Sequence, residues 1–139
     1  MIKKIEFKAI DAQRFSKSGE RLGNFRVDVN VTFVSLSKTQ PDEVEAQFRF
    51  TVTYTGLGVI RLEGNLLYQG DAERMMSVWN KYHNLPQEVA SEFHNAVFST
   101  SIPEAVMLAR DLQLPPPIPL PKISFKKGGS KPVFGPEVA

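Results

Sequence analysis

The chain has 139 residues, a typical length for one domain, and its 42% hydrophobic and 23% charged content is that of an ordinary globular protein. It has no run of about 18 apolar residues that could span a membrane, no signal-peptide core and no cysteine, so we expect a cytoplasmic protein without membrane insertion, disulfides or thiolate metal sites. The net charge is +2, but residues 1–121 carry 13 Lys/Arg and 14 Asp/Glu, a net of −1, so the positive excess belongs to the tail. A basic tail without a nucleic-acid-binding motif is typical of a solvated end, and we expect no nucleic-acid partner.

The first half of the chain alternates apolar and polar residues with the period of two that half-buried strands show. Such stretches occupy residues 4–9, 25–33, 44–54 and 59–63. The second and third are separated by residues 35–43, which are rich in turn formers. The phase of the first stretch changes at Ile10, which predicts a β-bulge there. Strands with one polar face each predict an antiparallel sheet that is solvated on one face and covered on the other.

The second half predicts two helices that could cover this sheet. Asp71 is the expected N-cap of a short helix, and Pro86 is expected in the first turn of a second helix that ends before the prolines at residue 115. Pro103 interrupts the apolar stripe of the second helix, and Ser101 precedes Glu104 with the spacing of a capping box. Two readings follow: a kinked continuous helix, or a new helix that starts near residue 101.

Strands followed by helices predict the α+β class, with a four-stranded antiparallel sheet and two helices packed on one of its faces. We expect a single domain over residues 1–125. Residues 126–139 contain the sequence KKGGSKP and little apolar content, which predicts a flexible basic tail.

Residues 114–125, LPPPIPLPKISF, form an unusual segment after the last helix. Five prolines in twelve residues forbid a helix and disrupt a sheet ladder, yet large apolar residues recur every two to four positions. This pattern predicts a rigid, extended, polyproline-like ribbon that displays apolar side chains. The alternative is that the ribbon packs on the sheet of its own subunit as part of the core.

No catalytic or metal-binding pattern stands out in the sequence. His83 and His94 have no partner at a diagnostic metal-ligand spacing, and Glu88 and Glu92 share a helix face as many solvated pairs do. The glycine pairs lack the context of a phosphate-binding loop, and no Ser/His/Asp signature is present. We therefore expect a protein that is not an enzyme and that uses no metal or cofactor.

The order of these elements, together with two motifs, resembles the SecB protein-export chaperones. Residues 58–64, GVIRLEG, are similar to their glycine-spaced strand G-x-F-x-I-x-G, and residues 114–125 are similar to their segment F-P-P-L-L-L-P-P-V-N-F. The resemblance spans most of residues 2–125. The acidic residues that such chaperones present to the SecA motor are poorly matched, since Asp11 corresponds to one but the region of Thr53 holds no acid, which disfavours a SecA-type partner.

The resemblance implies a homotetramer, built as a dimer of dimers, that acts as an ATP-independent holdase without a cofactor. Such proteins bind unfolded or partly folded client chains in long apolar grooves. The implied groove residues are Phe25, Val27 and Val29 on a strand and Leu114, Ile118 and Leu120 on the ribbon.

Three functions stay open at the level of sequence. The first is a general holdase that keeps exported or aggregation-prone chains unfolded. The second is a dedicated SecB-like chaperone of one partner, such as the antitoxin of a toxin–antitoxin pair. The third is a non-chaperone oligomeric scaffold that uses the same fold.

Overall fold

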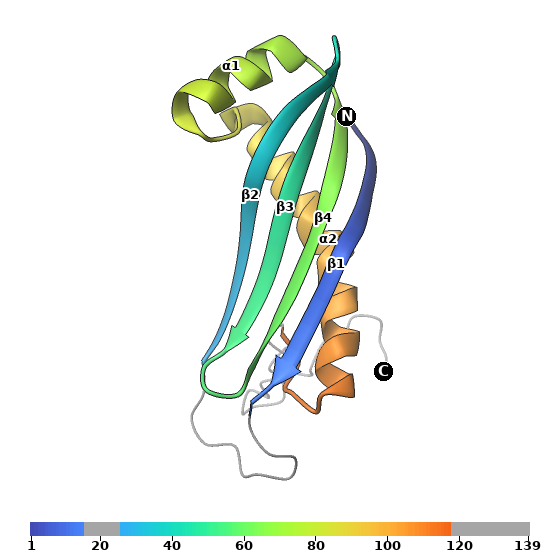
Figure 1. The fold of residues 1–139 in the computed structure, drawn as a ribbon, viewed down its shortest axis with the longest axis vertical. Helices are drawn as coiled ribbons and strands as arrows, with labels where there is room; N and C mark the ends of the chain where they lie inside the picture. The colour runs from blue at the N-terminus through green and yellow to red at the C-terminus, as the bar shows by residue number, and fades with distance from the viewer. Residues whose placement is uncertain (16–25, 118–139) are drawn as a thin grey trace, which may run out of the picture.

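Four long strands open the chain and two helices follow them (Figure 1). The computed structural model describes residues 1–15 and 26–117. The elements are β1 (Ile2–Arg14), β2 (Val27–Gln40), β3 (Glu43–Tyr54), β4 (Gly58–Gln69), α1 (Ala72–Tyr82) and α2 (Gln87–Asp111). This order confirms the predicted α+β class. The predicted domain boundary at residue 125 and the tail beyond it lie outside the described residues.

The strands form one antiparallel sheet in the order β1-β4-β3-β2, so that β1 and β2 are its edges. β4 extends well beyond the predicted residues 59–63, because Leu66 and Tyr68 continue the buried alternation that Ile60 and Leu62 begin. On β3 the alternation is equally regular, and its inward side chains from Val44 to Tyr54 are at most 1% exposed. The sheet therefore has one apolar inner face and one polar outer face, as predicted.

Both edge strands carry a bulge at the same level of the sheet. A row of paired residues crosses all four strands there, in the order Phe7, Gly64, Phe48 and Phe33. The register shifts directly after this row, between Phe7 and Ala9 in β1 and between Phe33 and Ser35 in β2. A bulge adds one residue to one strand and increases the local twist, so the sheet is bent along this row.

The bulge in β1 corrects the sequence prediction, which placed it at Ile10. The extra residue is Lys8, between Phe7 and Ala9. This insertion turns the following residues over, so that Ile10 pairs with Leu62 on the inner face. The phase change that is visible at Ile10 is thus the consequence of an insertion two residues earlier.

Gly64 is required by the close approach of β1 in this row. A Cβ atom at this position would stand 2.1 Å from the Glu6 carbonyl oxygen and 2.8 Å from Cζ of Phe48. The Phe48 ring occupies the space over the glycine and meets Phe7 edge to face at 6.3 Å. The second glycine of the GVIRLEG motif therefore has a steric explanation.

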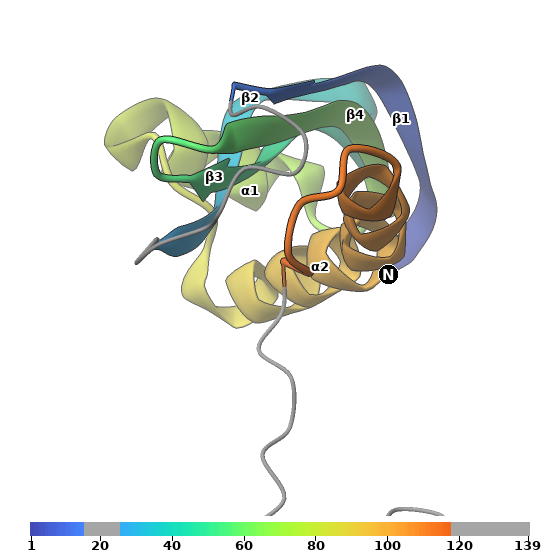
Figure 2. The ribbon, with the colours of Figure 1, turned by 90° about the horizontal axis from the view of Figure 1, so that it is seen from below.

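The helix α2 crosses the inner face of the sheet and lies on that side only (Figures 1 and 2). Its buried residues recur every four positions and are Phe93, Val97, Ser101, Ala105 and Ala109. The helix is continuous, with exposed Pro103 inside it, which excludes a restart near residue 101 and makes Ser101 an interior residue and no N-cap. The N-cap of α2 is Pro86 itself, one position before the predicted first turn. Of the helices in the described part of the chain, none is long and apolar enough to cross a membrane.

The helix α1 packs against β2 and β3 at one end of the sheet (Figure 1). Asp71 caps it as predicted, since its side chain accepts a hydrogen bond of 3.1 Å from the Arg74 N–H. Its buried residues, Ala72 and Met75, pack in the same hydrophobic core as the buried residues of α2. An ion pair between Arg74 and Glu88 links the two helices.

Candidate peptide-binding site

The predicted groove residues fall into three groups in the structure. Val27 and Val29 lie on the inner face of β2, where both are half-buried. Leu114 is only 7% exposed and belongs to the core of its own chain. Phe25, Ile118 and Leu120 lie outside the described residues. The position of the Leu114 side chain therefore agrees with the alternative in which this segment packs on the sheet of its own subunit, and not with display on an open ribbon.

Half-buried apolar residues line β2 and one side of α2, and the sequence reasoning missed those on the helix. We call them the β2–α2 strip, which consists of Val27, Val29, Val31, Phe98, Ile102 and Val106. Phe98 is 38% exposed and meets Phe50 of β3 edge to face at 5.6 Å. Phe50 pairs with Val31 of β2, so Phe98 and Val31 flank the same inner-face residue.

The helical part of the strip follows from spacing. Ile102 and Val106 succeed Phe98 at intervals of four, so all three lie along one side of α2, beside the buried stripe. The contact with Phe50 shows that this side is turned toward β3 and β2. An i, i+4 repeat of this kind could have been read from the sequence, where Ile102 was assigned to the stripe that packs on the sheet and Phe98 and Val106 were not singled out.

A shallow apolar hollow of about 290 Å³ continues the strip at the C-terminal end of α2. It is lined by Val106, Ala109, Arg110, Leu114 and Pro116. Val106 belongs to both the strip and the hollow, so the two surfaces are continuous. Arg110 is exposed and is the one charged residue among the described residues of the lining.

The turn after α2 brings the first residues of the proline segment to this place. The Gln113 N–H donates to the Arg110 carbonyl and the Leu114 N–H donates to the Ala109 carbonyl, at 3.1 and 2.8 Å. These two bonds, with Gln113 at φ 58°, form a Schellman motif, which ends the helix and turns the chain back toward the sheet. Leu114 then reaches β4, where its Cδ1 would stand 3.2 Å from a Cβ added to Gly58.

Tyr54 holds the next residue. Its hydroxyl donates a hydrogen bond of 2.6 Å to the Pro115 carbonyl oxygen. The Tyr54 side chain is fully buried, and burial raises its pKa to about 12. The hydroxyl is therefore a protonated donor at any physiological pH. Sequence reasoning could not single out Tyr54, because its alternation on β3 is that of an ordinary core residue.

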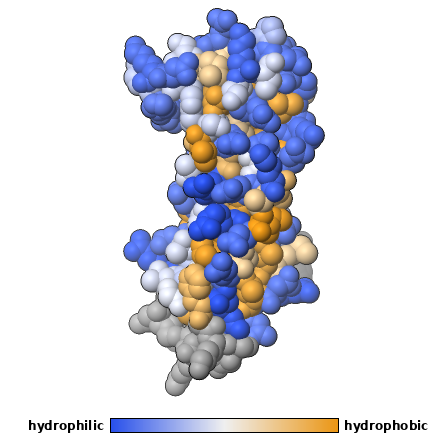
Figure 3. All heavy atoms as spheres, in the orientation of Figure 1, coloured by the Kyte–Doolittle hydropathy of each residue, from blue (hydrophilic) through white to orange (hydrophobic). Residues whose placement is uncertain are grey.

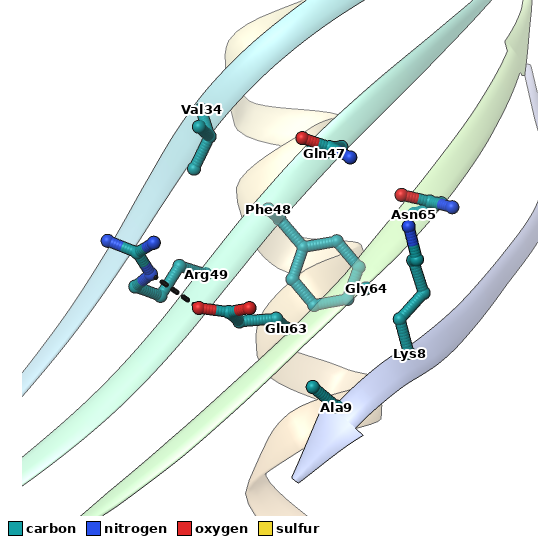
Figure 4. Close-up of a pocket in the computed structure, with 9 residues that line it drawn as sticks. All are labelled: Lys8, Ala9, Val34, Gln47, Phe48, Arg49, Glu63, Gly64 and Asn65. Atoms are coloured by element: carbon teal, nitrogen blue, oxygen red, sulfur yellow. Dashed lines mark hydrogen bonds and ion pairs between the residues drawn. The ribbon is translucent and has the colours of Figure 1, made fainter. Parts of the chain in front are cut away.

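The outer face of the sheet is different in character. Figure 3 shows many hydrophilic residues on this face, with hydrophobic ones among them. A hollow of about 200 Å³ lies here over the Phe48–Gly64 level, with Lys8, Gln47 and Asn65 around it (Figure 4). Arg49 and Glu63 close one side with an ion pair of 2.9 Å. Exposed pairs of this kind contribute little stability.

Three of the residues that were considered as catalytic or metal-binding candidates make contacts that stabilise the fold. Glu88 pairs with Arg74, His83 forms the C-cap of α1, and His94 contacts the Phe33 ring at 5.2 Å. Within residues 1–15 and 26–117, no group of three or more His, Cys, Asp or Glu side chains could hold a metal ion.

No family model matches the chain, and no curated protein matches it. Among solved structures, the chain is similar to that of the Rv1957 SecB-like chaperone of Mycobacterium tuberculosis in complex with a ChAD peptide from the Rv1956 HigA1 antitoxin. The two share 13% sequence identity and align with a TM-score of 0.58 over 89% of each chain. At this identity the similarity concerns the fold. The SecB-like fold predicted from the sequence is confirmed, and the similar structure is that of a chaperone and not of an enzyme.

Proposed function

We propose that this chain is an ATP-independent chaperone that holds extended, apolar polypeptide segments against the β2–α2 strip. The observation that carries the proposal is the contrast between this strip and its neighbours. The inward residues of β3 are at most 1% exposed, whereas the strip beside them is only half-buried and includes a phenylalanine that is 38% exposed. Contiguous apolar surface on a folded domain marks an interaction site.

The chemistry of the strip suits a chaperone. Burial of apolar surface contributes about 25 cal/mol per Å² and has no preferred direction, so many different sequences could bind. Among the residues expected from the sequence, Val27 and Val29 would contact the client directly. Leu114 would frame the hollow from within the core, and Phe25, Ile118 and Leu120 are proposed to extend the surface at its two ends.

The proposal includes assembly into a homotetramer, as a dimer of dimers, in the cytoplasm. Two edge strands in the described sheet have a neighbour on one side only, which leaves room for pairing between subunits. Light scattering should give a mass several times that of the 15.6 kDa chain. A monomer at micromolar concentration would refute this part of the proposal.

The test of the chaperone function uses two exposed apolar residues of the same helix. Phe98 lies on the strip, whereas Met107, which is 61% exposed, lies on the opposite side of α2 from the buried stripe. Phe98→Glu should abolish protection of a chemically denatured client from aggregation, and Met107→Glu should leave it intact. Equal protection by both variants would exclude the strip as the binding surface. Lack of protection by the parent protein would favour a non-chaperone scaffold.

Because Phe98 also contacts Phe50, a second variant guards against a folding defect. The double substitution Val27→Thr and Val29→Thr keeps the shape and the β propensity of both side chains and replaces one methyl group of each with a hydroxyl. It should fold and still lose most of the protection.

A dedicated chaperone of one antitoxin is the second candidate. It is favoured by the similar solved structure, which is described as a complex with an antitoxin peptide. Mass spectrometry of proteins that co-purify with the tagged chain distinguishes the two. One stoichiometric partner would favour the dedicated chaperone, and many substoichiometric partners would favour the general holdase.

A further inference from the structure

The hollow at the end of α2 has two walls of different origin. Val106, Ala109 and Arg110 belong to α2, whereas Leu114 and Pro116 belong to the proline segment. The helix wall is part of a regular element packed on the sheet. The proline wall exists only if residues 114–116 are held in place.

Three residues hold this wall: Leu114 and Pro115, whose backbones are hydrogen-bonded, and Pro117, which is buried. The Leu114 side chain is buried, and its N–H is bonded to the Ala109 carbonyl at 2.8 Å. Pro115 has no N–H to donate, so its carbonyl must anchor it, and this carbonyl accepts the Tyr54 hydrogen bond of 2.6 Å. Pro116, the next residue, is exposed and lines the hollow.

We propose that Tyr54 is a positioning residue for client binding, which holds the proline wall of the hollow through its hydroxyl. This inference rests on the proposed chaperone function. Tyr54 itself does not contact the client, because it is fully buried at the end of β3. It acts through Pro115, whose position sets that of Pro116 at the edge of the hollow.

The hydroxyl, and not the ring, is the part that makes this attachment. A phenylalanine would fill the same space in the core and would leave the Pro115 carbonyl without its donor. Pro115 is half-buried, and a partly buried acceptor that loses its donor is unfavourable, so the segment would open further toward water to recover a hydrogen bond. The geometry of the hollow would be lost while the sheet stays intact.

The experiment compares Tyr54→Phe with Tyr68→Phe. Tyr68 is a matched control because it is a buried tyrosine on the inner face of the neighbouring strand, at the other end of the sheet, where it pairs with Val44. Two measurements are made on each full-length variant. One is the hydrogen-exchange rate of the Leu114 amide by NMR, and the other is calorimetric binding of reduced, carboxymethylated α-lactalbumin, a permanently unfolded polypeptide.

We expect Tyr54→Phe to speed exchange of the Leu114 amide about tenfold and to weaken binding by a similar factor. Tyr68→Phe should change neither, and circular dichroism should show the same sheet in all three proteins. Faster exchange with unchanged binding would overturn the inference, because the proline wall would then be mobile without any effect on binding of the unfolded polypeptide. Unchanged exchange and binding would overturn it as well. If the parent does not bind the unfolded probe, the proposed function fails first and the role of Tyr54 in binding fails with it.

Discussion

The two ends of the inner face differ in how completely they are packed. At the end near α1, Phe93 of α2 is fully buried between Phe33 and Tyr68, with ring centroids at 5.7 and 5.0 Å. At the other end, the fully buried residues of α2 are Ala105 and Ala109, and half-buried Ile102, Leu108 and Leu112 pack beside them. Among the fully buried residues of α2, a large aromatic one occupies the first end and small ones occupy the second, and apolar surface of β2 stays accessible there.

The same contrast runs along β2. Leu36, at the end that α1 covers, is 6% exposed, whereas Val27, Val29 and Val31 at the other end are only half-buried. One strand therefore contributes to the core at one end and to the strip at the other. The comparison teaches that the core runs through both halves of the sheet, whereas the half-buried strip lies only beyond the bulged row at Gly64, and the proposed client surface would lie there.

The largest effect is expected from Gly64, where the two halves meet. Gly64→Ala places a methyl group 2.1 Å from a backbone oxygen of β1, which cannot move without breaking the strand pairing. We expect a loss of roughly 4 kcal/mol or failure to fold, which belongs to the rare class of severe substitutions. Urea unfolding at one fixed protein concentration is the measurement, because assembly makes stability depend on concentration.

Gly56 provides the matched control for this substitution. It has φ +76° in the β3–β4 turn, and no atom lies within 4 Å of an added Cβ. Gly56→Ala should therefore cost only about 1 kcal/mol of backbone strain. Similar losses at both glycines would show that conformation, and not the approach of β1, dictates Gly64.

A second prediction compares two phenylalanines of α2, one from each half. Phe93 is fully buried and Phe98 is 38% exposed. Phe93→Ala should cost about 3 to 5 kcal/mol of unfolding free energy, the usual range for a buried phenylalanine. Phe98→Ala should cost clearly less and should reduce client protection instead. The opposite ranking in denaturant unfolding would mean that the strip is part of the core.

The sequence predicted the fold well because its strongest patterns are local. Alternation along β2 and β3 and the Asp71 cap depend on neighbouring residues, and both are confirmed. The bulge at Lys8 was misplaced because alternation shows where the phase has changed and not where the residue was inserted.

The candidate site was less accessible to sequence reasoning, because it depends on contacts between distant residues. Tyr54 and Pro115 are separated by 61 positions, and no pattern in either segment indicates their hydrogen bond. Leu114 was expected to be displayed, yet the Schellman turn directs it into the core. Phe98 was missed because the side of a helix that faces an incompletely covered strand can be identified only once the helix is placed on the sheet.

A third prediction concerns the loss of folding stability at alkaline pH that follows from the buried hydroxyl of Tyr54. The pKa of Tyr54 is raised from 10.0 to about 12 by burial, so between these values the folded state keeps a proton that the unfolded state loses. Stability is therefore fully present below pH 10 and falls as the pH rises toward 12, by about 2 to 3 kcal/mol for a shift of two units.

The measurement for this prediction is the difference between the parent and Tyr54→Phe in urea unfolding at pH 9, 10 and 11. The parent should lose more stability than the variant over this range. Tyr68, whose pKa is raised by burial and further by the charge of Glu92, remains in both proteins and cancels in the difference. Parallel curves would contradict a protonated, buried hydroxyl at Tyr54.

The smallest effect is expected at Ser101, between the two halves of the buried stripe of α2. Its side chain is fully buried, and its hydroxyl finds no hydrogen-bond partner among the described residues. A buried polar group without a partner is destabilising, and alanine is similar in size with a better helix propensity. Ser101→Ala should therefore stabilise the protein by about 1 kcal/mol, a few degrees in melting temperature.

Ser99→Ala, at an exposed position of the same helix, reports the propensity alone and should give a smaller gain. A loss of stability at Ser101 would show that the hydroxyl is hydrogen-bonded in the assembled protein, to water or to a second subunit, and this part of α2 would then belong to an interface as well as to the core.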